Sequence, residues 1–242
     1  MNIIEANGLS KHFGNHVAVG GIDLSVKTGE LFGLLGVNGA GKTTVIRMLS
    51  CLSQPTAGDA HMDGHSIKTD SDAVKAIIGV SPQTTSVAPN LTVRENLELM
   101  ARIYGQSRKD AAERAEAIIN EHRLIEVATR RAKVLSGGWQ RRLSIAMAVI
   151  SDPKILFLDE PTLGLDVLAR RDLWRTVQQM KGHKTMILTT HYLEEAEALC
   201  DRIAIMVKGE IRAIGTPTEL KELAGTATFE EAFIRIAEGG LL

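Results

Sequence analysis

Residues Leu31–Thr44 read LFGLLGVNGAGKTT and contain the most informative pattern in the chain. It opens with a short, almost continuous apolar run, LFGLL, which is typical of a strand buried on both faces. The residues that follow fit the phosphate-loop pattern G-x-x-x-x-G-K-[ST], and the helical pattern TTVIRMLSCL begins at Thr43. A strand, a glycine-rich loop and a helix in this order predict a site for the phosphates of a nucleotide.

The loop contains the groups that bind phosphate in proteins. Its glycines allow backbone N–H groups to turn inward as an anion nest, and the following helix adds the positive end of its dipole. Lys42 is expected to reach the β- and γ-phosphates, and the Thr43 hydroxyl is expected to bind Mg²⁺. The residues that we predict to hold the nucleotide are Gly36, Val37, Asn38, Gly39, Ala40, Gly41, Lys42, Thr43 and Thr44.

Two later apolar runs have the same character as LFGLL. They are Ile155–Leu158, ILFL, and Met186–Leu188, which lies within KTMILTTH. Each run is short and bounded by polar residues or glycine, and helical patterns separate the runs. Continuous rather than alternating apolar character favours strands that are covered on both faces. We therefore predict an α/β fold with a mainly parallel core sheet.

The segment from Asn90 to Ile150 is helical in character. Thr92–Glu95 forms a capping box, a second helix is expected over about Arg108–His122, and a third helix begins near Ser136. This pattern predicts an all-helical insertion within the α/β frame. Further capping boxes, which predict two helices near the C-terminus, begin at Thr216 and Thr228.

Two stretches predict short antiparallel strands at the margin of the fold. They are IIEANGLSKHFG near the N-terminus and RIAIMVKGEIRAIG after residue 201. We expect one domain over residues 1–242, with an α/β core at about 1–86 and 151–242 and a helical subdomain at about 87–150.

Two adjacent carboxylates, Asp159 and Glu160, end the apolar run ILFLDE. A buried parallel strand delivers such residues to the carboxyl edge of the sheet, where the phosphate loop also lies. Adjacent strand residues point to opposite sides, so the two carboxylates should have different roles. We expect Asp159 to hold Mg²⁺ through its water shell and Glu160 to polarise the attacking water as general base.

His191 and Gln83 follow two other predicted strands, MILTT and IIGVSP. Alone, a histidine after a strand is more often structural than catalytic. Because the neighbouring strands end in phosphate- and metal-binding groups, we expect His191 to sense the γ-phosphate. The amide of Gln83 can reach Mg²⁺ or the attacking water and report that contact to another part of the protein.

Composition limits the partners that the chain can have. The formal net charge is −1, so no overall field attracts nucleic acid, and we expect no nucleic-acid partner. Cys51 and Cys200 show neither metal spacing nor a disulfide framework, which favours small buried thiols in a reducing compartment. The sequence has no run long enough to cross a bilayer and no signal-peptide pattern. We expect a cytosolic protein that another subunit would have to hold at a membrane.

Residues Leu135–Arg142 read LSGGWQRR and resemble a second anion-binding device. A serine and two glycines at the start of a helix leave unpaired N–H groups and the positive end of a dipole. The chain already has one phosphate loop, so a second such device raises the question of which phosphate it binds. We expect Arg141 and Arg142, further along this helix, to form a solvated face.

Together these motifs resemble the nucleotide-binding subunit of ABC transporters. Their order along the chain is Phe13, GVNGAGKT, Gln83, LSGGWQRR, ILFLDE, LGLD and His191. The resemblance covers essentially the whole chain. It implies a P-loop NTPase of the ABC ATPase type, in which an antiparallel β subdomain and an inserted helical subdomain accompany the core sheet.

The resemblance also implies roles for individual residues. Phe13 matches the aromatic residue that stacks on adenine, and Asp166 ends the D-loop LGLD. The signature motif, whose amides and hydroxyl bind the γ-phosphate of ATP, corresponds to Ser136, Gly137 and Gly138. Trp139 stands where the commonest signature has glutamine. Its indole is expected to stack near the ribose or base of a nucleotide held by a second chain, or against the adjoining helical surface.

In that family the signature of one chain binds the ATP held by a second chain. Two ATP molecules lie between two subunits that face each other head to tail. The resemblance therefore implies ATP and Mg²⁺ as cofactors and a second ATPase subunit, identical or different, as partner. ATP binding would close the dimer through charge-assisted bonds, and hydrolysis would reopen it.

The segments LTVRENLELMARIYG, PTLGLD and TFEEAFI look like those of ATPase subunits of ABC-2-type exporters. This likeness implies a separate transmembrane permease, contacted through Gln83–Tyr104, and export of a drug, lipid or polysaccharide. The chain would then lie peripherally on the cytoplasmic face of the plasma (inner) membrane. The alternatives are an importer ATPase, a non-transport ABC ATPase acting on nucleic acid or ribosomes, and a weakly catalytic regulatory subunit.

Overall fold

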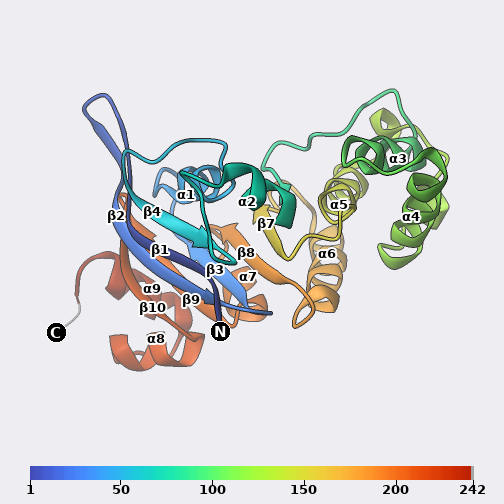
Figure 1. The fold of residues 1–242 in the computed structure, drawn as a ribbon. Coiled ribbons are helices and arrows are strands. Elements are labelled where there is room, and N and C mark those ends of the chain that lie inside the picture. Colours follow the sequence, from blue (N-terminus) through green and yellow to red (C-terminus); the bar gives the residue numbers. More distant parts are fainter. Residues whose placement is uncertain (241–242) are drawn as a thin grey trace.

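The computed structural model of the chain describes residues 1–240. The strands are β1 (Asn2–Phe13), β2 (His16–Lys27), β3 (Leu31–Leu35), β4 (Ala57–Met62), β5 (His65–Ser66), β6 (Ile78–Ser81), β7 (Ile155–Asp159), β8 (Thr185–Thr190), β9 (Arg202–Val207) and β10 (Glu210–Gly215). The α-helices are α1 (Lys42–Leu49), α2 (Ser71–Ile77), α3 (Val93–Ile103), α4 (Arg108–Glu121), α5 (Gly137–Ala148), α6 (Val167–Met180), α7 (Leu193–Leu199), α8 (Pro217–Ala224) and α9 (Phe229–Ala237). Two short 3₁₀ helices span Ile125–Val127 and Ala132–Val134. The β-sheets lie at one end of the molecule and helices α3 and α4 at the other (Figure 1).

The larger sheet has the strand order β10-β9-β3-β8-β7-β6. Strands β9, β3, β8, β7 and β6 run parallel, and every residue of β3, β7 and β8 is buried. Alternate residues of each strand belong to two hydrophobic clusters: Leu31 and Leu35 pack with the helices α3–α7, whereas Phe32 and Leu34 pack with β1, β2 and α1. The sheet is therefore covered on both faces, which confirms the predicted α/β fold with a mainly parallel core.

Strand β9 does not lie where the sequence predicted it. β9 and β10 form an antiparallel pair as expected, but β9 also pairs in parallel with β3 and so lies inside the core sheet. Of this antiparallel pair, only β10 lies at an edge of the sheet. The physical reason is the apolar run Ile203–Met206, whose residues are all buried and need cover on both faces.

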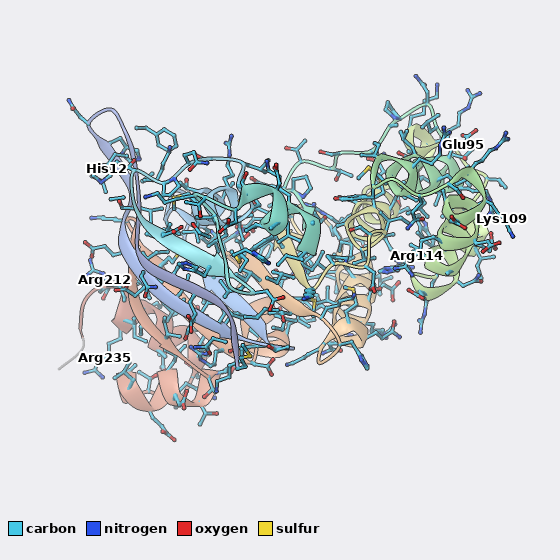
Figure 2. All side chains as sticks on the ribbon, in the orientation of Figure 1. His12, Glu95, Lys109, Arg114, Arg212 and Arg235 are labelled. Atoms are coloured by element: carbon cyan, nitrogen blue, oxygen red, sulfur yellow. The ribbon has the colours of Figure 1, made fainter. Side chains whose placement is uncertain are left out.

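A smaller, antiparallel sheet has the order β2-β1-β4-β5. Its longest strands, β1 and β2, form a hairpin whose last pair is Phe13 with His16. Figure 2 labels His12 near the tip of this hairpin. The antiparallel pairing predicted for IIEANGLSKHFG is thus confirmed, but the stretch forms one long strand of 12 residues rather than short strands. Phe13 lies at the end of this strand, next to the hairpin turn.

Helices α3, α4 and α5 lie between β6 and β7 in the chain. The capping boxes predicted at Thr92, Thr216 and Thr228 are all present and begin α3, α8 and α9. Within residues 1–240, no helix is long and apolar enough to cross a membrane.

Helix α5 packs closely on strand β6. A Cβ atom on Gly79 would lie 2.1 Å from the carbonyl oxygen of Ala148, so only glycine allows this approach. The buried hydroxyls of Ser81 and Ser144 lie 3.0 Å apart and hydrogen-bond to each other. These contacts fix α5 to the strand that leads directly into Gln83.

Candidate active site

The phosphate loop joins β3 to α1, as predicted. Gly41 has φ 103°, and a Cβ atom there would lie 2.6 Å from the carbonyl oxygen of Ala18. A Cβ atom on Gly36 would lie 2.4 Å from the carbonyl oxygen of Met206. Because these two residues lack a Cβ atom, the loop can pack against the backbone of Ala18 and Met206. The loop then curves around the N-terminus of α1.

Two buried charges meet beside this loop. Nζ of Lys42 lies 3.2 Å from Oε1 of Glu160, and each side chain is only 5% exposed. The same ammonium donates to the carbonyl oxygens of Gly36 and Val37 at 2.7 and 3.3 Å. Lys42 is therefore held at the loop, with its charge balanced by the carboxylate that follows β7.

Glu160 is also held from the neighbouring strand. Its second carboxylate oxygen, Oε2, lies 2.7 Å from Nδ1 of His191, the residue after β8. Its backbone N–H donates to the Thr189 hydroxyl at 2.9 Å. Glu160 has φ 48°, a backbone conformation uncommon for a residue with a side chain. The bend at the end of β7 thus turns the carboxylate toward both Lys42 and His191.

Asp159 accepts two hydroxyl hydrogen bonds at the end of β7. The Thr43 hydroxyl donates to its Oδ1 at 3.1 Å, and the Thr189 hydroxyl donates to the same atom at 2.6 Å. Among residues 1–240, no group of three or more His, Cys, Asp or Glu is placed to hold a metal alone. A hydroxyl and one carboxylate fit Mg²⁺, which prefers oxygen ligands and commonly takes the rest from phosphates and water.

One cavity of about 490 Å³ lies beside Lys42, Thr43 and Glu160. It is lined by the phosphate loop, Glu160, Gln83 and the aromatic Phe13 at the end of β1. Phe13 is 55% exposed, and Nζ of Lys11 lies 5.2 Å from its ring centroid. An exposed ring at one end and buried charges at the other suit a ligand with a planar base and a chain of phosphates.

The signature residues line a different cavity. Ser136 and Gly138 border a cavity of about 700 Å³ together with Asp166, and no described residue lines both cavities. Ser136 is the N-cap of α5, and Asp166 caps α6 by accepting from the backbone N–H of Ala169 at 2.9 Å. The fold therefore brings the phosphate loop, Glu160, His191 and Gln83 together. The signature lies apart from them, at the surface beside the other cavity.

The two arginines after the signature do not form a solvated face, so that prediction was wrong for both. Arg141 is 3% exposed and donates to the carbonyl oxygens of Pro82, Gln83 and Glu160. Burial lowers the pKa of its guanidinium. Arg142 is largely buried: its guanidinium lies 4.7 Å from the Trp139 ring centroid, which places the indole against the helical surface.

Sequence reasoning also missed two buried residues behind the site. Thr189 supports both Asp159 and Glu160 from β8, and Glu195 of α7 is fully buried, accepting from Nε1 of Trp174 at 3.0 Å. Burial raises the pKa of Glu195. A buried threonine in TMILTTH resembles any β-branched strand residue, so only the pairing of β7 with β8 reveals its role.

Comparisons with known proteins show which family the chain is similar to. The model of the ABC transporter family matches residues 19–163. The chain is 44% identical to the daunorubicin/doxorubicin resistance ATP-binding protein DrrA of Streptomyces peucetius, over 92% of this chain and 68% of that protein. It is 40% identical to the Nod factor export ATP-binding protein I of Ralstonia nicotianae, over 90% and 68%. It is 44% identical to ABC transporter A family member 9 of Dictyostelium discoideum, but spans only 26% of that longer protein.

Solved structures of similar fold are ATP-binding cassettes. The ATP-binding subunit of an ABC transporter superposes with a TM-score of 0.85 at 28% identity, over 97% of this chain and 99% of that one. A dimeric cassette in a post-hydrolysis state, bound to ADP and Pi, has a TM-score of 0.79 at 27% identity, over 88% and 98%. The chain therefore belongs to the ABC transporter family, as an ATP-binding subunit that hydrolyses ATP.

Proposed function

We propose that the chain binds Mg–ATP in the 490 Å³ cavity and that Glu160 is the general base for hydrolysis. One observation supports this proposal above the others. The adjacent ends of β3, β7 and β8 bring Lys42, Glu160 and His191 into direct contact at distances of 3.2 and 2.7 Å. A cation for phosphate, a carboxylate for water and a histidine beside it are the groups that phosphoryl transfer needs.

Binding would begin with an exchange of partners at Lys42. A γ-phosphate that approaches the loop competes with Glu160 for the ammonium, and so releases one carboxylate oxygen from its ion pair. Phe13 would stack on the base, and the loop N–H groups would donate to the phosphates. The hydroxyl of Thr43 and the carboxylate of Asp159 would hold Mg²⁺. When bound, Mg²⁺ supplies positive charge that neutralises the phosphate oxygens.

The chemical step is an in-line attack of water on the γ-phosphorus. The bond between that phosphorus and the β–γ bridging oxygen breaks, a carboxylate oxygen of Glu160 takes the proton of the water, and ADP and phosphate leave. His191 is hydrogen-bonded to the other carboxylate oxygen. It would orient Glu160 and, through that contact, sense the γ-phosphate. Gln83, on the cavity wall, would report the contents of the site to the helical subdomain, which we place at residues 87–150.

The signature faces outward, and this supports a site completed by a second copy of the chain. Ser136, Gly137 and Gly138 at the start of α5 would bind the γ-phosphate held by the partner's loop, with Asp166 at the same surface. The dimeric form of the solved ATP-binding cassette supports this arrangement.

The work that hydrolysis drives is proposed to be export through a separate transmembrane permease. The printed names of two relatives, a drug-resistance protein and a Nod factor export protein, support a drug, lipid or polysaccharide cargo. Leu99 and Ile103 of α3 and its C-cap Tyr104 are exposed, and they would offer a largely apolar surface for that permease. The chain would then lie on the cytoplasmic face of the membrane.

Replacing Glu160 by glutamine tests the proposed base directly. Glu160→Gln keeps the shape of the side chain but removes its proton affinity, so kcat should fall by roughly 10²–10⁴-fold while ATP still binds. The variant should accumulate as a closed dimer in the presence of Mg–ATP, visible by size-exclusion chromatography. Glu194→Gln, an exposed carboxylate on α7, is the matched control and should retain wild-type turnover. A wild-type kcat in Glu160→Gln would remove Glu160 from this role.

A further inference from the structure

Arg141 is a buried cation close to the candidate active site, yet outside the cavity that would hold ATP. Its guanidinium donates to three main-chain carbonyl oxygens: Pro82 at 2.6 Å, Gln83 at 2.8 Å and Glu160 at 2.9 Å. The side chain is 3% exposed. A buried charge is costly unless fully satisfied, so three such bonds mark a fixed structural junction rather than an incidental contact.

The three acceptors belong to two different loops. Pro82 and Gln83 follow β6, whereas Glu160 follows β7. A planar guanidinium with five N–H donors in a fixed fork can hold both loops at once, and a lysine ammonium cannot reproduce that geometry. Arg141 therefore sets the separation between the backbone of Gln83 and the backbone of Glu160.

Arg141 also belongs to the signature helix. It lies about one turn after Gly137, the first residue of α5. The helix is held to β6 by the hydroxyl pair of Ser81 with Ser144 and by its close approach to Gly79. Helix α5 thus contains the signature at its start and, one turn later, Arg141, which hydrogen-bonds to both loops.

The surrounding charges explain why a cation is tolerated here. Asp159, Glu160 and Glu195 are the carboxylates whose negative charge favours the charged form of Arg141, against the burial that lowers the pKa of its guanidinium. The positive charge is thus placed behind the carboxylates that would hold the metal and the water. Its loss would disturb their positions without removing any group that touches ATP.

We propose that Arg141 is a positioning residue for hydrolysis: it fixes Gln83 and Glu160 relative to each other and to the signature helix. This inference rests on the proposed roles of Gln83 and Glu160. Because Arg141 acts on the backbone behind the cavity, it should affect the chemical step far more than the binding of ATP. Displacement of a catalytic group by about 1 Å can cost about 10²-fold in rate.

The test compares Arg141→Lys with Arg114→Lys in the full-length protein. Arg114 is a matched control because it too donates to two main-chain carbonyls of the same region, Ile150 at 3.0 Å and Val149 at 3.2 Å, just beyond the far end of α5. Figure 2 shows Arg114 on the helical end of the molecule, away from the phosphate loop. For each variant, kcat, the dissociation constant for ATP and the melting temperature are measured.

We expect kcat of Arg141→Lys to fall by about 10- to 100-fold, with an ATP dissociation constant within about twofold of wild type. Arg114→Lys should retain wild-type kcat. If Arg141→Lys does not fold, Arg141→Gln carries the same test, since it removes the buried charge. Wild-type kcat in a folded Arg141 variant, an equal loss in Arg114→Lys, or misfolding of both Arg141 variants would overturn the proposal.

Glu160→Gln in the same assay separates this inference from the proposed function. If Glu160→Gln hydrolyses ATP normally, the proposed base is wrong, and the inference fails with it. If Glu160→Gln is inactive and Arg141→Lys is as active as wild type, only the positioning role of Arg141 is refuted.

Discussion

At the scale of single residues, the site depends on charges that are balanced in a buried place. Lys42 and Glu160 are each 5% exposed and pair at 3.2 Å, with His191 on the other side of the carboxylate. Such a pair contributes little net stability, because desolvation offsets its attraction, but removing one partner leaves an uncompensated charge. The same two residues that would serve ATP hydrolysis therefore depend on each other for the folded state.

Replacing Lys42 should reveal this dependence. Lys42→Met removes the ammonium and leaves the buried carboxylate of Glu160 without its cation, so the free energy of unfolding should fall by about 3 kcal/mol. Urea denaturation measures this loss of stability. The double variant, which combines Lys42→Met with Glu160→Gln, should recover part of the lost free energy of unfolding. In the exposed pair of Lys154 with Asp63, Lys154→Met should cost less than ~1 kcal/mol. If Lys42→Met and Lys154→Met lost the same free energy of unfolding, this explanation would be wrong.

At the scale of elements, the end of helix α4 contains a buried titratable group. His122 is the C-cap of α4 and is 5% exposed, and its Nδ1 has no hydrogen-bond partner among the described residues. Burial, together with the positive charges of Arg114 and Arg142, lowers its pKa from 6.5 to about 4. His122 is therefore neutral in the folded protein at pH values where it is protonated in the unfolded chain.

This difference predicts that acid weakens the protein before its carboxylates titrate. Between pH 6.5 and about 4 the unfolded chain binds a proton that the folded protein does not, so stability rises with pH in that window. From pH 7.5 to pH 5 the free energy of unfolding should fall by ~2 kcal/mol on account of His122. His122→Gln should remove this part of the slope in urea titrations at several pH values. His183→Gln changes an exposed histidine that lines the same 460 Å³ cavity as His122, and this variant should keep the slope. An unchanged slope in His122→Gln would refute the assignment.

Elements whose signals are local could be predicted from the sequence. The phosphate loop, the capping box of Thr92 and the carboxylates after ILFL depend on neighbours within a few residues, and each lies where its pattern indicated. Arg141 was misassigned because α5 is buried around most of its surface, so charge alone did not mark an outward face. Its partners lie 58, 59 and 19 residues away, and no local pattern encodes such contacts.

At the scale of the whole molecule, one chain carries two halves of different sites. The phosphate loop, Gln83 and Glu160 line one cavity, and Ser136 with Gly138 borders another. Helix α5 connects these two regions. It begins at the signature, and its Arg141 donates hydrogen bonds to the backbone of Gln83 and Glu160 beside the other cavity. Under the proposed function, a second copy of the chain supplies the missing half of each site, as two-fold symmetry would allow.

Mixing two inactive variants tests whether each site is shared between two chains. Lys42→Ala loses the phosphate-loop cation but keeps its signature, whereas Ser136→Arg blocks the signature but keeps the loop. Each variant alone should be almost inactive. An equimolar mixture should regain about a quarter of the wild-type ATPase rate, since about half of the dimers would be mixed and each would hold one intact site. A mixture as inactive as its components, or a Ser136→Arg variant that hydrolyses ATP at the wild-type rate by itself, would contradict the account.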